Sequence, residues 1–351
     1  MSEIKIPESL RETYVVKNFP AIVVVTVMST ILLNYVWNGK IKKRKVNDSA
    51  VLITDCDSGF GWECARRLDR LGFHVFAGFR NPQEDRALRL QAKASRNLQL
   101  VQLDVTNNEE VKNAARFVQE RLPPGITGLH SLINVSRDML HGHFDWYTSE
   151  QCQRIIDANL TGVVRVTKCF LHLLKPIPGR IINISSINGK FPLPEMSVYT
   201  AANFGLEGFT KSLRHDLKPM GIKVTVIIPG EVSRSSFGVQ CQKEDMEIMW
   251  EEMNESNKRH YEQFFKEWRR RMQDSLRKEN IVSRKLLKIF LVDLEDALFS
   301  KNPQDQYVSV TDPFRTVLRI LKILPSCFRH KVVRLLTGEN KNTRKKTLKN
   351  D

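Results

Sequence analysis

Short apolar, β-branched runs alternate with longer amphipathic stretches from about residue 49 onward, and this alternation limits the possible folds more than any other feature. Nearly continuous apolar strands, each followed by a helix, indicate a parallel sheet that is covered on both faces. The sequence therefore predicts an α/β fold with a doubly wound parallel sheet, whose ligands bind at the carboxyl ends of the strands. The strand-like runs are VLIT at 51, HVFAGF at 74, LQLVQLDV at 98, HSLINV at 130, RIINIS at 180 and KVTVIIP at 223, and helical stretches cover 60–71, 107–122, 150–175 and 198–217.

The composition fits one main domain with appendages. At 351 residues and 41% apolar residues, the chain is long enough to bury one large core and to leave roughly eighty to a hundred residues over. Neither a zinc site nor a disulfide framework is indicated, because the cysteines form no C-x-x-C spacing, and reduced thiols in a cytosolic domain fit best. The cysteines lie at 56, 64, 152, 169, 241 and 327.

Residues 19–37 contain no charged side chain and form the candidate membrane anchor. As a helix this segment would span roughly 28 Å, which is close to the hydrocarbon thickness of a bilayer. The basic run KIKKRK follows at 40–45, so the positive-inside rule places the main domain in the cytosol. A buried or interfacial helix is the alternative. A cleaved signal peptide is not indicated, because no small-residue cleavage site follows the apolar run.

The charge pattern favours a membrane surface over nucleic acid as a partner. Residues 240–300 mix dense charge with Met and aromatic residues, which indicates helices that cover an apolar surface. Residues 314–336 repeat hydrophobic residues at helical spacing with Arg and Lys between them. The net charge is +16, yet the sequence contains no zinc finger, aromatic RNA-binding motif or basic recognition helix.

The turn after the first strand run reads TDCDSGFG, from Thr54 to Gly61. A Gly-x-Gly pair that opens a helix leaves bare backbone at which a pyrophosphate can approach the helix N-terminus. The alternative is that Gly59 and Gly61 serve only the close packing of the helix on the strand. Further along the chain, Ser186 precedes Tyr199 by thirteen residues.

Together these motifs make residues 49–235 resemble the short-chain dehydrogenase/reductases. The stretches VLITDCDSGFG, VFAG, VTKCFLHLLK, GRIINISSINGK and NFGLEGFTKSLRHDL are most similar to the membrane-associated branch with retinol dehydrogenases, 17β-hydroxysteroid dehydrogenase type 2 and 3-hydroxybutyrate dehydrogenase. The resemblance implies a Rossmann-type core. Together with the apolar and charged runs described above, it divides the chain into a tail at 1–18, an anchor at 19–37, a basic linker at 38–48, the core at 49–240, a substrate-covering and membrane-associating helical extension at 241–336 and a basic tail at 337–351.

The family's catalytic residues are present except for one. In this family a tyrosine exchanges the substrate proton, a serine holds the carbonyl oxygen and an asparagine anchors a water-linked relay to a lysine. The resemblance assigns the first three roles to Tyr199, Ser186 and Asn159. The lysine, which lowers the tyrosine pKa and holds the nicotinamide ribose, is replaced by Asn203. Oxidation needs the base and therefore suffers more from this loss than reduction.

The resemblance also implies a nicotinamide cofactor, bound near the carboxyl ends of the strands. No acidic residue ends the second strand run; Arg80 stands there instead, where a cation could meet a 2′-phosphate. This favours NADP(H) and leaves NAD(H) open, and the alternative for Arg80 is a solvated helix start. The candidate cofactor residues are Thr54, Asp55, Ser58, Gly59, Gly61, Arg80, Asp104, Asn134, Pro229 and Gly230.

Further departures from the family pattern lie on the cofactor side. The first glycine of the turn is Asp55, the family's Asn-Asn-Ala-Gly has become the sequence Asn134 to Arg137, and its threonine after Pro-Gly is Arg234 unless the register slips to Ser235. A carboxylate at Asp55, about 5 Å from a pyrophosphate charge, costs roughly 3 kcal/mol at an effective dielectric of about 20. We hypothesise that Asp55 and Arg137 form an ion pair that competes with the dinucleotide.

Structural roles are the alternatives for several of these residues. Ser186 and Asn159 could serve as hydrogen-bonding core residues, Tyr199 as a buried tyrosine and Asp104 as a cap for the turn after its strand. Two further residues, His141 and His143, lie close enough in the sequence to resemble a pair of metal ligands. They lack an acidic partner at usable spacing and are expected in a solvated loop.

Two functions remain open from the sequence. The first is an atypical membrane-anchored oxidoreductase for a lipophilic alcohol or ketone of the steroid or retinoid class. The second is a catalytically inactive relative that binds a lipid or a partner protein at the membrane. Family analogy favours the endoplasmic reticulum and a homodimer through the helices at 150–175 and 198–217.

Overall fold

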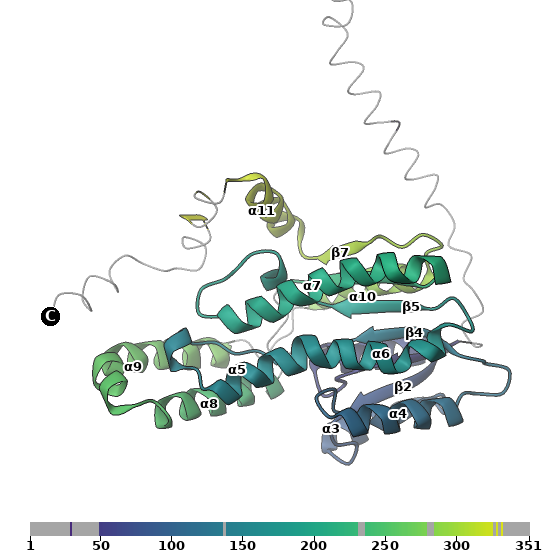
Figure 1. Cartoon of the computed structure of the whole chain (residues 1–351), viewed down its shortest axis with the longest axis horizontal. Helices are drawn as coiled ribbons and strands as arrows, with labels where there is room; N and C mark the ends of the chain where they lie inside the picture. The colour runs from purple at the N-terminus through teal and green to yellow at the C-terminus, as the bar shows by residue number, and fades with distance from the viewer. Residues whose placement is uncertain are drawn as a thin grey trace, which may run out of the picture. The chain divides into compact units, whose positions relative to one another are not determined.

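The computed structural model describes residues 49–135, 138–230, 236–278 and 284–325, together with Ser29, Phe328 and 331–332. Seven parallel strands form one sheet in the order β3-β2-β1-β4-β5-β6-β7, which confirms the predicted doubly wound parallel sheet (Figure 1). The strand order reverses between β1 and β4, so ligands of such a sheet bind at the carboxyl ends of these strands. The strands are β1 (Ala50–Ile53), β2 (His74–Phe79), β3 (Leu98–Gln102), β4 (Leu129–Asn134), β5 (Arg180–Ile184), β6 (Lys223–Pro229) and β7 (Gln306–Ser309).

Helices cover both faces of this sheet. In the view of Figure 1, α4, α6 and α7 lie in front of the strands and α10 lies behind them. Helix α2 packs on α10, where the rings of Phe60 and Phe290 lie 4.6 Å apart and Arg67 pairs with Glu295. The helices are α2 (Gly59–Arg70), α3 (Asp85–Gln91), α4 (Asn108–Glu120), α5 (Ser149–Ile156), α6 (Gly162–Leu174), α7 (Ser197–Leu217), α8 (Ser236–Glu251), α9 (Glu255–Lys278), α10 (Arg284–Phe299) and α11 (Asp312–Ile323).

Side chains just before the helices fix where they begin. The Asn107 side chain accepts hydrogen bonds from the backbone N–H groups of Glu109 and Glu110 at the start of α4. Thr148 and Gln151 form a reciprocal capping box at the start of α5. Each cap satisfies backbone donors that have no partner inside the helix and contributes about 1 kcal/mol. Polar capping residues therefore mark these two boundaries in the sequence.

One core cluster joins the strands to α4, α6 and α7. Leu52, Phe76, Leu132 and Phe170 are at most 1% exposed within it. Burying a side chain of this size contributes about 1.5–3 kcal/mol, so the apolar runs that predicted the strands also supply much of the driving force for folding. The carboxyl ends of the strands are thereby held in fixed positions.

The C-terminal extension is not wholly helical, and this corrects the prediction for 241–336. Its residues 306–309 form β7, which pairs with β6 and gives the sheet its seventh strand. Helix α8 also begins at Ser236, ahead of the expected boundary at 240. The core and the extension therefore share one sheet.

The predicted N-terminal anchor lies outside the described residues apart from Ser29, and so do the tail at 1–18, the basic linker at 38–48 and the basic tail at 337–351. Within the part of the chain that the structure describes, no helix combines the length and apolar character needed to cross a membrane. The segment 314–336 is described as far as 325 and at three later residues, and α11 forms its first part.

Candidate active site

The turn between β1 and α2 keeps a backbone that glycine normally provides. Asp55 has φ 50°, in the left-handed region that favours glycine. A Cβ atom on Gly61 would lie 2.2 Å from the carbonyl oxygen of Asp55, so the helix can approach the turn only with glycine there. The Ser58 hydroxyl accepts from the Gly61 N–H and donates to the Asp55 carbonyl. Ser58 and Gly61 therefore shape the turn, and Gly61 allows its close packing against α2.

The side chains of Thr54 and Asn134 form hydrogen bonds with residues at the ends of neighbouring strands. The Thr54 hydroxyl donates to the Val135 carbonyl at 2.8 Å and accepts from the Val135 N–H at 2.9 Å, which joins β1 to β4. The Asn134 amide donates to Asn183 at 2.8 Å and to Thr167 at 3.1 Å. Both residues are almost completely buried and hold the strand ends in register.

Asp104 was considered either as a cofactor residue or as a cap for the turn after its strand, and the structure shows it capping that turn. Its carboxylate accepts from the backbone N–H and the hydroxyl of Thr106, which caps the turn after β3. Pro229 ends β6, and the N–H of Gly230 donates to the Ser309 carbonyl of β7. Asp104, Pro229 and Gly230 therefore lie at the carboxyl end of the sheet, where they form contacts within a turn or between strands.

Arg80 lies among carboxylates at the end of β2. Its backbone N–H donates to the Asp57 carboxylate at 2.9 Å, and its side chain is exposed. Burial acts to lower the pKa of Arg80, but the neighbouring carboxylates of Asp55, Asp138 and Asp57 outweigh it and raise the pKa. Burial likewise raises the pKa of Asp57. The cation that faces Asp55 among the described residues is therefore Arg80, while Arg137 and Arg234 lie outside the described residues and their predicted roles stay predictions.

Tyr199 lies in the first turn of α7 and is 6% exposed. Among the described residues its hydroxyl has no hydrogen-bond partner. Ser186 precedes a short turn at Ile187–Gly189, where its hydroxyl accepts from the Asn188 N–H at 3.2 Å. The Asn188 side chain also reaches Thr200 at 3.4 Å, so this turn is tied to the start of α7. The structure thus brings Ser186 and Tyr199 to neighbouring elements.

Asn203 is folded back onto its own helix. It is 3% exposed, and its amide donates to the Tyr199 carbonyl at 2.9 Å. Its side-chain oxygen lies 3.4 Å from the Ser185 hydroxyl. One turn further on, Glu207 forms an ion pair with Lys190, and burial raises the pKa of Glu207. The position of the family's lysine is therefore filled by a neutral amide that serves the helix.

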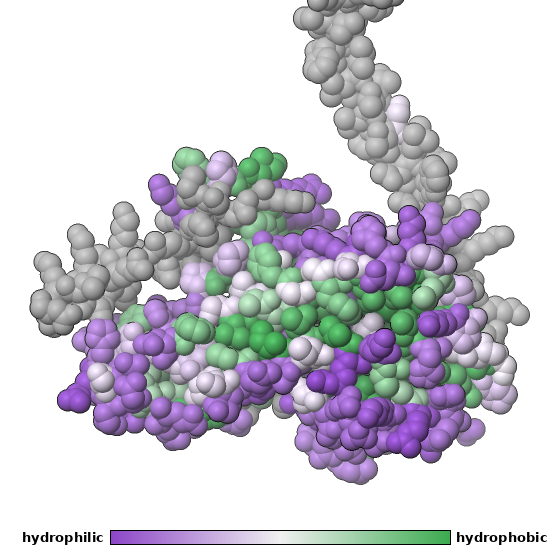
Figure 2. Space-filling view, viewed as in Figure 1, coloured by the Kyte–Doolittle hydropathy of each residue, from purple (hydrophilic) through white to green (hydrophobic). Residues whose placement is uncertain are grey.

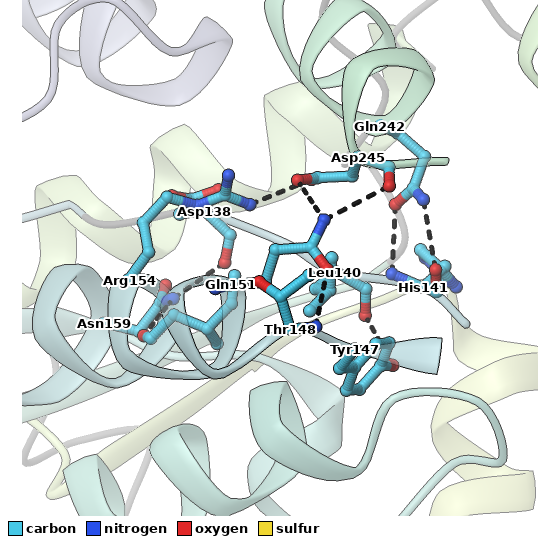
Figure 3. Close-up of polar contacts among 11 residues, drawn as sticks. Asp138, Leu140, His141, Tyr147, Thr148, Gln151, Arg154, Asn159, Gln242 and Asp245 are labelled. Carbon is cyan, nitrogen blue, oxygen red and sulfur yellow. Dashed lines mark hydrogen bonds and ion pairs between the residues drawn. The ribbon is translucent and has the colours of Figure 1, made fainter. Parts of the chain in front are cut away.

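Asn159 lies in a π-helical turn, Asp157–Thr161, that joins α5 to α6. Its amide donates to the carbonyl of Asp138 at 2.7 Å and to that of Ile155 at 2.9 Å. Single π-turns of this kind are frequent at functional sites. Asn159 thereby fixes the segment that follows β4 against α5, and it lies below the network in Figure 3.

A buried polar network connects that segment to α8 (Figure 3). Arg154 of α5 bridges two carboxylates, Asp138 at 3.0 Å and Asp245 of α8 at 2.9 Å. The Gln151 amide also donates to Asp245, whose side chain is 1% exposed. Gln242 of α8 exchanges two hydrogen bonds with the backbone of His141. The network fixes α8 to the loop that follows β4.

Sequence reasoning missed this network. Its carboxylates and cation come from three segments that are far apart in the chain, and the only local signal was the polar Gln242 and Asp245 within an otherwise mixed helix. His143 contacts the rings of Trp146 and Phe264 at 5.1 and 5.3 Å. Within the described ranges, no cluster of His, Cys, Asp and Glu side chains is suited to hold a metal ion.

Apolar side chains of α8 and α9 cover Tyr199. Met246, Met249, Phe265 and Trp268 are at most 2% exposed and belong to one buried cluster with it. The Trp268 indole donates to the Glu195 carboxylate at 2.9 Å, which ties α9 to the loop before α7. Two of these four side chains are methionines, which pack adaptably in irregular apolar surroundings.

The family model of short chain dehydrogenases matches residues 49–245, which include the glycine turn, Ser186, Tyr199 and the first part of α8. The chain belongs to this family. It is 37% identical to a mitochondrial D-beta-hydroxybutyrate dehydrogenase of Bos taurus over 62% of this chain and 64% of that protein. It is 32% identical to retinol dehydrogenase 5 of Mus musculus over 74% and 80% of the two chains, and 33% identical to 17-beta-hydroxysteroid dehydrogenase type 6 of Rattus norvegicus over 75% and 80%. The match to the hydroxybutyrate dehydrogenase spans just under two thirds of its length.

A nicotinamide dinucleotide fits the backbone of this site. Gly59 and Gly61 have no side chains that would keep a phosphate away from the N-terminus of α2. Asp55 keeps the left-handed backbone conformation of the glycine that it replaces. The side chains fit less well, because Asp55 adds a negative charge and Asn203 supplies no cation. Arg80 would offset the first change.

Proposed function

We propose that this chain is an atypical oxidoreductase that reduces a lipophilic ketone or aldehyde. The observation that carries the proposal is the Tyr199 hydroxyl, which has no partner among the described residues and lies under the apolar cover of α8 and α9. A tyrosine hydroxyl that no protein group engages is available to donate to a substrate oxygen. Tyr199 would donate the proton to the substrate oxygen, and Ser186 would hold that oxygen.

Reduction is the favoured direction because of Asn203. A lysine at this position would stabilise the phenolate that oxidation requires, whereas reduction requires the protonated tyrosine. Bound NADPH or NADH would supply the hydride. Thr54, Ser58, Gly59 and Gly61 would shape the cofactor turn, and Arg80 would favour NADPH by meeting its 2′-phosphate. A steroid-like or retinoid-like substrate agrees with the relatives' activities.

We also propose a homodimer at a membrane, with the endoplasmic reticulum as the compartment. An apolar surface runs across the face that α6 and α7 form in Figure 2. Val164 and Phe204 are exposed on these helices, and Phe144, Ile156 and Val198 line a hollow of about 540 Å³ at α5 and α7. These features support a second copy that packs on the helices at 150–175 and 198–217.

A binding protein without catalysis is the second candidate. Asp55 in the cofactor turn and Asn203 in place of the lysine favour it, because both weaken the interactions that a dinucleotide needs. In that case the apolar cover over Tyr199 would enclose a lipid. The two candidates differ in whether a nicotinamide cofactor binds.

Titration of the full chain with NADPH and with NADH, followed by cofactor fluorescence, separates the candidates. We expect saturable binding with NADPH tighter than NADH, since Arg80 is present. Binding that does not saturate at millimolar cofactor would overturn the oxidoreductase proposal and favour the lipid-binding one.

Replacing Asp55 by Gly should strengthen cofactor binding and stabilise the fold. Glycine adopts φ 50° without strain, and relief of that strain is worth about 1 kcal/mol. Removing the carboxylate should also raise NADPH affinity on the order of tenfold or more. Asp55→Asn is the matched control, because it removes the charge and keeps a side chain. If Asp55→Asn and Asp55→Gly both leave affinity unchanged, the carboxylate does not oppose the cofactor.

A further inference from the structure

A second pocket of about 660 Å³ lies between α7, β7 and α11. Four basic side chains line it, Lys190, Lys211, Arg315 and Arg319, against one acidic side chain, Asp293. None of the residues assigned to the proposed reaction lines this pocket. Its excess of cationic groups indicates an anionic ligand.

The acidic side chain of the pocket is already engaged. The Asp293 carboxylate accepts from the Ser309 hydroxyl at 2.6 Å, and burial raises the pKa of Asp293, which favours its neutral form. Lys190 is paired with Glu207. Lys211 and Arg319 are exposed and form no ion pair with another described residue. Two cations therefore remain to meet a ligand.

Arg315 supplies a third, incompletely used donor. Its Nε atom is buried and has no hydrogen-bond partner among the described residues. Its Nη2 atom makes only long contacts, at 3.3 Å to the Val308 carbonyl and 3.4 Å to the Val310 carbonyl. Buried donors without acceptors are uncommon, and a guanidinium matches the oxygen atoms of a phosphate well.

The outer side of α11 is apolar beside these cations. Ile323 is 84% exposed and Ile320 is 54% exposed, although the opposite side of the helix is held by Leu321 against Phe191. Arg319 and Ile323 are four residues apart and therefore lie on the same helix face. Figure 2 shows hydrophobic and hydrophilic surface next to each other at α11. Helices of this type lie in the headgroup region of membranes.

We propose that this pocket binds the phosphate headgroup of an anionic phospholipid, whose acyl chains run along Ile320 and Ile323. Arg315, Arg319 and Lys211 hold the phosphate by charge-assisted hydrogen bonds. The apolar residues beside them select a lipid over a free phosphate. The site is separate from the proposed reduction and does not depend on it.

The test is calorimetric titration of the full chain with soluble short-chain lipids. Dioctanoyl phosphatidic acid should bind, and dioctanoyl phosphatidylcholine should bind at least tenfold more weakly. Glycerol 3-phosphate and inorganic phosphate measure the headgroup alone and should bind weakly. Lys211→Glu with Arg319→Glu should lower phosphatidic acid affinity at least tenfold. The matched control, Lys93→Glu with Arg96→Glu, makes the same change of charge at exposed residues outside the pocket and should change affinity less than twofold.

Two further results decide the role of the apolar residues and the source of the phosphate. Ile320→Ser with Ile323→Ser should weaken phosphatidic acid binding and leave glycerol 3-phosphate binding unchanged. Equal losses from the pocket pair and the control pair would overturn the proposal, since attraction would then be spread over the surface. Equal affinity for phosphatidic acid and phosphatidylcholine would also overturn it. So would tighter binding of glycerol 3-phosphate than of the lipid, which would identify a free phosphate compound as the ligand.

Discussion

Replacing Asn203 by Lys should raise the rate of alcohol oxidation on the order of a hundredfold, which is the lower end of the contribution of general acid and base groups, because the ammonium group stabilises the phenolate that oxidation requires. The new ammonium group would lie one helical turn from Tyr199 and one turn from Glu207, whose carboxylate can stabilise it. The site is 3% exposed, so the longer side chain should also lower the free energy of unfolding by about 1–3 kcal/mol. Steady-state kinetics with NADP⁺ and a steroid or retinoid alcohol, together with thermal unfolding, measure both effects.

The matched control for this change is Asn203→Met, which has similar length and no charge. It should reproduce the loss of stability without the gain in rate. A second control combines Asn203→Lys with Tyr199→Phe and should abolish the gain, because the charge acts through the tyrosine. A gain that survives Tyr199→Phe would show that the lysine acts elsewhere, and no gain at all would show that the missing charge does not limit the rate.

Replacing Arg154 by Met should destabilise the fold more than any other single change in the polar network. It leaves Asp138 and Asp245 without their shared cation, and Asp245 is 1% exposed. Loss of one partner from a fully buried pair costs about 3–5 kcal/mol, and because the Arg154 side chain is 38% exposed we expect about 2–3 kcal/mol. Chemical denaturation measures this difference, and proteolysis of α8 should become faster.

Two variants separate the buried pair from an ordinary surface pair. Arg89→Met breaks the exposed pair with Asp85 and should cost less than about 1 kcal/mol. Arg154→Met combined with Asp245→Leu removes the isolated carboxylate and should recover most of the lost stability. If the double variant is as unstable as the single one, the cost does not come from the unpaired charge.

The pH dependence of Arg154→Met follows from one of these carboxylates, Asp138. Burial raises the pKa of Asp138 even with Arg154 present, so the folded chain holds this proton more tightly than the unfolded chain. The contribution of such a group to stability falls as pH rises from its unfolded pKa through its folded pKa. Without Arg154 the Asp138 carboxylate should follow this course more strongly, because the guanidinium that lowers its pKa is gone. The variant should therefore lose less stability at pH 5 than at pH 7, and denaturation at the two values tests this.

Much of the sheet could be predicted because its strands are apolar along their whole length. The runs at 51, 74, 98, 130, 180 and 223 all became parallel strands, since burial on both faces leaves a local signature. The seventh strand was missed because QYVS is short, partly polar and surrounded by charged helices. Its partner β6 lies far away in the sequence, and only the folded sheet brings the two together.

The sequence allowed us to predict which residues form the candidate site, but not which contacts their side chains make. The spacing of Ser186 and Tyr199 predicted that the two residues act together, and the position of Asn203, four residues after Tyr199, showed that the family's lysine is absent. The bond from Asn203 to the Tyr199 carbonyl could not be read from the sequence, because it depends on the rotamer inside α7. The same holds for Arg80, whose neighbours Asp55 and Asp138 come from the ends of two other strands.

The late position of β7 in the chain has a consequence for synthesis on the ribosome. After β6 has emerged, all of α8, α9 and α10 must be translated before β7 is available to cover its edge. At about 5–20 residues per second this takes roughly four to fifteen seconds. During that interval the backbone donors and acceptors of a highly apolar strand are open to pairing with other nascent chains. Chaperone binding to chains stalled between β6 and β7 should consequently be stronger than to chains released after β7.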